Sequence, residues 1–95
     1  ATCEDARLLG LDRVVDRLTT TGSGDIGVTL EKAPEDLADA LQEATLVIAK
    51  GMANYESLTE YADLPPIAYL MAVKCDTIAE SVGVPRGSLV AMLVP

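Results

Sequence analysis

A lysine stands where a short apolar run ends. Residues 45–49 (TLVIA) are apolar and β-branched, as in a buried strand of a parallel sheet. Lys50, Gly51 and Asn54 follow it, and ligands of open parallel sheets bind beyond the carboxyl ends of the strands. A lysine there can meet phosphate as a point charge, glycine allows close approach to the backbone, and Asn54 could cap the next helix or donate to an anion. Lys50 could equally extend into water, and the residues alone leave both interpretations open.

Two more segments are expected at the same edge of the sheet. The loop TTTGSGDIG, residues 19–27, follows residues 13–20, whose β-branched side chains favour a strand. Amides of its Gly22, Ser23 and Gly24 could form an anion nest, although an ordinary glycine-rich connection fits as well. GSGDIG matches G-x-G-x-x-G only formally, because VTLE follows in place of a helix. Lys74 comes after the predicted strand 65–73, and for it a solvent-exposed strand end is the favoured interpretation.

Alternating helix and strand signals predict the elements that position these residues. Thr2 and Asp5 form a capping-box pattern at the start of the first helix, and Gly10 suits its end. We expect helices over 3–9, 33–44, 54–62 and 75–82, and strands over 13–20, 45–49, 65–73 and 87–94. This order predicts an α/β fold, with a mostly parallel sheet and helices on both faces in three α/β/α layers. Residues 1–95 would be one small α/β domain or the C-terminal half of a larger doubly wound domain.

Composition excludes several classes of function. The net charge of −8 disfavours nucleic acid and anionic membrane surfaces as partners. With two distant cysteines, Cys3 and Cys75, and no histidine, a zinc site and a disulfide scaffold are both disfavoured. No apolar run approaches the roughly 20 residues of a membrane span. These features predict a cytoplasmic protein.

Several strings, in the same order along the whole chain, resemble one family. LVIAKGMANYESL is similar to the KGxxNYE segment of the damage-control phosphatases, the former domain-of-unknown-function eighty-nine family. ATCEDARLLGLDRV, TTTGSGDIGVTLE and YLMAVKCDTIAESVGVPRGSLV resemble three further motifs of that family, especially those of its small archaeal and bacterial members. Met52, Asp25 and Ile26 depart from the family pattern.

The resemblance implies a metal-dependent phosphatase that hydrolyses small phosphate esters, often damaged or side-product metabolites. Lys50 would contact the phosphate as the catalytic lysine, assisted by amides of Gly51 and of the 22–27 loop. Asn54 and Lys74 match motif positions as well. The family's divalent metal, such as manganese, cobalt, nickel or magnesium, is held by residues that have no counterpart in this chain. We therefore expect no metal ligand here, an N-terminal remainder as partner, and an inactive isolated chain.

Two alternatives remain beside the phosphatase fragment. A non-catalytic module for a small phosphorylated ligand would use the same edge of the sheet and need no metal. A purely structural α/β domain would use its exposed sheet edge to pair with a companion chain or segment.

Overall fold

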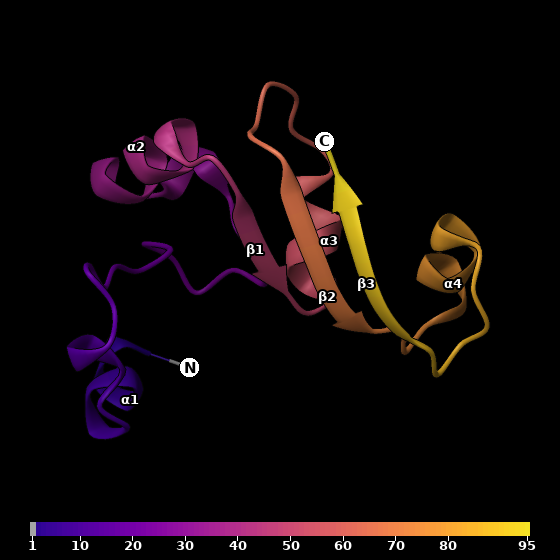
Figure 1. Ribbon diagram of the computed structural model, residues 1–95, viewed down its shortest axis with the longest axis horizontal. Helices are drawn as coiled ribbons and strands as arrows, with labels where there is room; N and C mark the ends of the chain where they lie inside the picture. Colours follow the sequence, from indigo (N-terminus) through magenta and orange to yellow (C-terminus); the bar gives the residue numbers. More distant parts are fainter. Residues whose placement is uncertain (1) are drawn as a thin grey trace.

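The computed structural model describes residues 2–95, which form a small α/β fold (Figure 1). Its sheet has the order β1-β2-β3. Two short 3-10 turns, Leu11–Arg13 and Leu30–Lys32, complete the regular structure. In chain order the helices and strands are α1 (Cys3–Leu8), α2 (Glu35–Glu43), β1 (Val47–Lys50), α3 (Met52–Leu58), β2 (Ile67–Ala72), α4 (Asp76–Val82) and β3 (Leu89–Val94).

Two helix ends form as the sequence predicts, whereas the helix predicted over 54–62 runs from Met52 to Leu58. The amide of Asp5 donates to the Thr2 hydroxyl over 3.2 Å, and the Thr2 amide donates to the Asp5 carboxylate over 3.0 Å. This reciprocal capping box satisfies two amides that the first turn of α1 leaves without partners. Gly83 ends α4 in the left-handed region, with φ +74°, where glycine is favoured.

The sheet is parallel only in part. β1 runs parallel to β2, with Val47 opposite Ile67 and Lys50 opposite Leu70, whereas β3 runs antiparallel to β2. A parallel crossover must carry the chain back along the sheet, and α3 together with residues 59–66 does this. After α4 the chain turns at once, and the Gly87 amide donates to the Val73 carbonyl over 2.7 Å. β3 therefore starts where β2 ended, which forces the antiparallel direction.

The strand predicted over residues 13–20 is wrong. This segment begins with the end of a 3-10 turn and continues without regular structure. Val14 is 76 % exposed. β-branched residues favour a strand only where a neighbouring strand and an apolar surface are available, and residues 2–95 supply neither at this place. The glycine-rich loop therefore does not follow a strand, which removes the reason for placing it at the ligand edge.

The core lies between one face of the sheet and the helices α3 and α4. Tyr69, on β2, is 1 % exposed, and its ring meets that of Tyr55, on α3, edge to face at a centroid distance of 5.1 Å. Figure 1 shows α3 behind the strands and no helix in front of them. Helices were expected on both faces, but the core of residues 2–95 forms on one face only. The buried core residues are Ala49, Leu58, Ile67, Tyr69, Met71, Val73, Ile78 and Ala79.

Candidate phosphate site

The carboxyl ends of β1 and β2 lie at the same edge of the sheet, as predicted. Lys50 is the last residue of β1, and Lys74 lies just beyond β2. The backbone amide of Lys74 donates to the Sδ atom of Met52, the first residue of α3, over 3.2 Å. The parallel pairing of β1 and β2 therefore brings the two lysine-bearing strand ends together, with the start of α3 beside them.

The side chain of Lys50 lies on the sheet face opposite α3. Side chains alternate between the two faces along a strand, and Ala49 is 4 % exposed in the core that includes Leu58 of α3. Lys50 pairs in register with Leu70, which is 39 % exposed on the other face. Within residues 2–95, the Lys50 ammonium takes part in no hydrogen bond or ion pair. A positive charge is thus presented to solvent at the edge where a ligand would bind.

Gly51 and Asn54 fix the turn that follows Lys50. Gly51 has φ +91°, a region that residues with a side chain rarely adopt. Its amide donates to the Leu70 carbonyl over 2.8 Å and therefore extends the sheet ladder. That amide is not free to hold an anion, contrary to our expectation. The Asn54 side chain donates to the Lys50 carbonyl over 2.8 Å, so it closes the turn by bonding to backbone.

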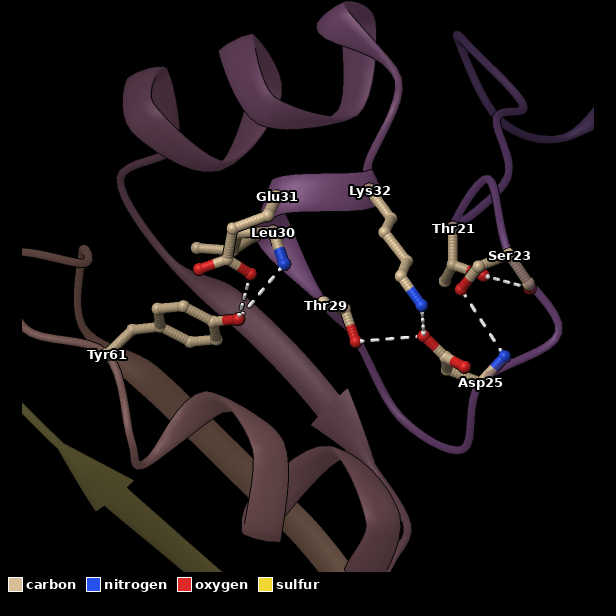
Figure 2. Close-up of polar contacts among 8 residues, drawn as sticks. All are labelled: Thr21, Ser23, Asp25, Thr29, Leu30, Glu31, Lys32 and Tyr61. Carbon is tan, nitrogen blue, oxygen red and sulfur yellow. Dashed lines mark hydrogen bonds and ion pairs between the residues drawn. The ribbon is translucent and has the colours of Figure 1, made fainter.

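The glycine-rich loop is closed by bonds within itself (Figure 2). The Gly22 amide donates to the Thr20 hydroxyl over 3.3 Å. The Asp25 amide donates to the Ser23 hydroxyl over 3.3 Å, as Figure 2 shows. The Gly22 amide therefore already has an acceptor, whereas the amides of Ser23 and Gly24, which were also expected in the anion nest, donate in no hydrogen bond among the described residues. Gly24 lies in open space, with no atom within 4 Å of where a Cβ would stand.

An ion pair neutralises the acidic group of this loop. Lys32 Nζ lies 2.9 Å from a carboxylate oxygen of Asp25, which also accepts from the Thr29 hydroxyl over 3.3 Å (Figure 2). The hydrogen bond and the positive charge of Lys32 hold the pKa of the Asp25 carboxyl below its usual value. The pair keeps the loop from presenting a free negative charge.

The far end of the loop docks on α3 and on the turn after it. The Val28 amide donates to the Ser57 hydroxyl over 3.0 Å. The Tyr61 hydroxyl accepts from the Leu30 amide over 3.1 Å and donates to the Glu31 carboxylate over 2.9 Å (Figure 2). The sequence analysis missed Ser57 and Tyr61, because their hydrogen-bond partners lie 29 to 31 residues away along the chain and no local sequence pattern predicts such contacts.

The predicted site residues therefore form two groups. Lys50, Gly51, Asn54 and Lys74 gather at the strand ends, whereas the loop with Gly22, Ser23 and Gly24 leads to α3, which covers the opposite face of the sheet. Among the described contacts, no hydrogen bond or ion pair joins the Lys50 side chain to this loop. The structure thus supports the strand-end group as the candidate site and leaves the loop apart from it.

A groove between α3 and α4 is a poorer candidate for a phosphate. It measures about 530 Å³ and is lined by Tyr55, Glu56, Glu60 and Cys75, among others. The two glutamates would repel a phosphate. In residues 2–95, no group of three or more histidine, cysteine, aspartate or glutamate residues could hold a metal ion. By themselves, the described residues therefore do not make up a site for the divalent metal that the resemblance implies.

A family model, the damage-control phosphatase ARMT1-like domain, matches residues 1–90. The chain belongs to this family. A damage-control phosphatase of Archaeoglobus fulgidus is 47 % identical over 94 residues, and one of Pyrococcus horikoshii is 36 % identical over 92 residues. The alignments cover 99 % and 97 % of this chain. An uncharacterized protein of Methanocaldococcus jannaschii is 45 % identical, over 97 % of the chain.

The family fold is found in a solved structure as well. The crystal structure of a DUF89 family protein from Pyrococcus horikoshii matches 97 % of this chain with a TM-score of 0.87 and 36 % identity. The chain spans about a third of the length of these relatives, 31 to 32 % in each case. The resemblance found in the sequence motifs is confirmed. None of the helices in residues 2–95 is long and apolar enough to cross a membrane.

Proposed function

We propose that this chain is part of a metal-dependent phosphatase that hydrolyses small phosphate esters, such as damaged or side-product metabolites, and that Lys50 contacts the phosphate. The observation that carries the proposal is the match of the damage-control phosphatase family over residues 1–90. The parallel β1–β2 pair supports it, because this pairing places Lys50 at the edge where ligands of open α/β sheets bind.

Lys50 would stabilise negative charge on the phosphoryl group. Its ammonium is exposed, and no carboxylate of the described residues lies within ion-pair distance of it, so its charge is available to a ligand. Lys74 adds a second positive charge at the neighbouring strand end. Gly51 and Asn54 act on the backbone of the turn and thereby position Lys50. Gly22, Ser23 and Gly24 stay outside this proposal, because the end of their loop is bound to α3, on the face of the sheet opposite Lys50.

The remainder of the site would come from other parts of the protein. A divalent ion, manganese, cobalt, nickel or magnesium, belongs to the proposal through the family resemblance. Its ligands would lie outside residues 2–95, since these hold no suitable group. Isolated, the 95-residue chain would therefore be inactive.

The test replaces Lys50 in the complete protein. Lys50→Ala should lower the turnover of a generic phosphate ester by about 10²-fold or more, the usual effect of removing one preorganised charge stabiliser. Arg86→Ala is the matched control, because Arg86 is also an exposed cation but lies 3.8 Å from Asp76. Near-normal turnover of Lys50→Ala, with manganese added, would count against the proposal.

A second candidate is a non-catalytic module that binds a small phosphorylated ligand at the same edge. The lack of a metal-ligand group in the described residues favours it for the isolated chain. Calorimetry with inorganic phosphate, with and without manganese, separates the two functions. Binding that needs no metal supports the module, whereas binding that appears only with manganese supports the enzyme.

A further inference from the structure

The backbone amide of Lys74 points toward β1, at a level of the sheet where β1 has already ended. The Leu70 carbonyl accepts from the Gly51 amide, so the polar backbone groups of Leu70 face β1. Alternate residues of a strand point their backbone groups to the same side, and Lys74 lies four residues after Leu70. The Val73 amide points the other way, since it donates to the Ser88 carbonyl over 2.9 Å. Strand β1 therefore offers the Lys74 amide no carbonyl.

The sulfur of Met52 takes the place of that carbonyl. The Lys74 amide donates to the Met52 Sδ atom over 3.2 Å, and a thioether sulfur can act as a weak acceptor. Met52 is the first residue of α3 and follows Gly51, whose own amide closes the ladder between β1 and β2. This one bond therefore joins the end of β2 to the turn that comes directly after Lys50.

Lys50 and Lys74 belong to the same face of the sheet. Lys50 pairs in register with Leu70, and alternate side chains of a strand share a face, so Lys74 continues the face of Lys50. The burial pattern agrees, because Val73 is 0 % exposed on the core side and Lys74 is exposed. Within residues 2–95, neither lysine side chain takes part in an ion pair. Two positive charges are thus available to one anion at neighbouring strand ends.

We propose that Met52 is a positioning residue of the phosphate site: its sulfur holds the backbone of Lys74 so that Lys74 and Lys50 face the same phosphate. This role rests on the proposed function, because it requires phosphate to bind beside Lys50. A backbone that is already fixed loses less conformational freedom when the anion binds, which increases affinity. The competing explanation is packing alone, because Met52 also contacts the core cluster that contains Met71.

The test uses Met52→Leu in the complete protein. Leucine keeps the approximate volume and the apolar contacts of methionine but offers no acceptor. Met71→Leu is the matched control, because it makes the same substitution in the same core cluster, at a residue that is 5 % exposed. The Met71 sulfur accepts no hydrogen bond within residues 2–95. Met52→Gln is the rescue variant, since its amide oxygen can accept from the Lys74 amide.

The first readout is hydrogen exchange at the Lys74 amide, resolved to single residues by mass spectrometry. Exchange should be at least about threefold faster in Met52→Leu than in the parent protein, because the amide loses its acceptor. In Met71→Leu and Met52→Gln the rate should change by less than about twofold. This readout requires no phosphate, and an unchanged rate in Met52→Leu would overturn the proposal.

The second readout is the Kd of inorganic phosphate, measured by calorimetry with manganese present. Met52→Leu should raise this Kd at least about threefold, and Met71→Leu should change it by less than about twofold. In a Lys74→Ala background, Met52→Leu should add less than about twofold, because its effect passes through Lys74 and the two substitutions are therefore not additive. Equal losses with and without Lys74, or in Met52→Leu and Met71→Leu, would show that Met52 only packs and would overturn the proposal.

Failure of this role and failure of the proposed function give different results. Phosphate binding that Lys50→Ala abolishes but Met52→Leu leaves unchanged overturns the role of Met52 alone. A parent protein that binds no phosphate overturns the proposed function and the role of Met52 together, while the exchange rate still reports whether the bond to Lys74 exists. A Met52→Leu protein that does not fold also counts against the proposal, because Met52 would then serve the core.

Discussion

Gly27→Ala tests whether the glycine-rich loop is held against α3 as the structure has it. Gly27 has φ +77°, and a Cβ built there would stand 2.6 Å from the Ala53 carbonyl oxygen and 2.6 Å from the Ser57 hydroxyl oxygen. The Ala53 oxygen is backbone and cannot rotate away. The loop must therefore shift, and the bond from the Val28 amide to Ser57 is the first contact that this shift breaks.

The cost has two parts. A left-handed conformation with a Cβ costs roughly 1–2 kcal/mol. A part-buried amide that loses its acceptor costs about 1–3 kcal/mol more. The free energy of unfolding of Gly27→Ala should therefore fall by about 2–5 kcal/mol, a large share of the stability of a small domain.

Gly10→Ala isolates the first part of this cost. Gly10 also has φ +77°, but no atom lies within 4 Å of the position that a Cβ would take there, so only the backbone strain of about 1–2 kcal/mol applies. Urea unfolding followed by circular dichroism measures both variants of the 95-residue chain. If Gly27→Ala and Gly10→Ala lose the same stability, to within about 0.5 kcal/mol, the contact between the loop and α3 is not as described.

The remaining predictions concern the core and two titrating groups. Leu58→Ala should lower the free energy of unfolding of the 95-residue chain in urea by about 2–5 kcal/mol, because Leu58 is 3 % exposed. Leu89→Ala should lower it by less than about 0.5 kcal/mol, and equal losses in the two variants would contradict the assigned core. Lys32 lowers the pKa of Asp25 in the folded state, so this pair stabilises the fold above about pH 4 and its contribution is lost as pH falls through the lowered pKa. NMR titration of the Asp25 carboxyl checks this, and a midpoint that Lys32→Ala leaves unmoved would refute it. Burial raises the pKa of Tyr69, so the contribution of Tyr69 to the stability of the fold is complete below about pH 10 and is lost as pH rises. Tyr69→Phe should therefore reduce the loss of stability at alkaline pH. An unchanged loss in this variant would refute the prediction.

Local signals in the sequence predicted much of the secondary structure. The capping box of Thr2 and Asp5 and the left-handed glycine at Gly83 form as expected, because each depends on residues within one helical turn. The apolar run that ends at Lys50 forms β1, parallel to β2. Its position before Gly51 and a helix also carried the family resemblance, which the family match over residues 1–90 confirms.

Signals that depend on distant partners misled the prediction. Residues 13–20 have β-branched side chains, but a strand needs a neighbour, and the described chain offers none there. The antiparallel direction of β3 follows from the immediate turn after α4, closed by Gly87 and Val73. The sequence pattern of a buried strand is the same in either direction, so this direction could not be read from it.

The sequence by itself determined which residues could meet a phosphate, because residue type and position after a strand are local properties. Only the tertiary structure decided which of them lie together. Strand register places Lys50 on the face opposite α3, whereas Ser57 ties the end of the glycine-rich loop to α3. The physical reason is that register and long-range hydrogen bonds join residues that are far apart along the chain, and no local pattern encodes such a pairing.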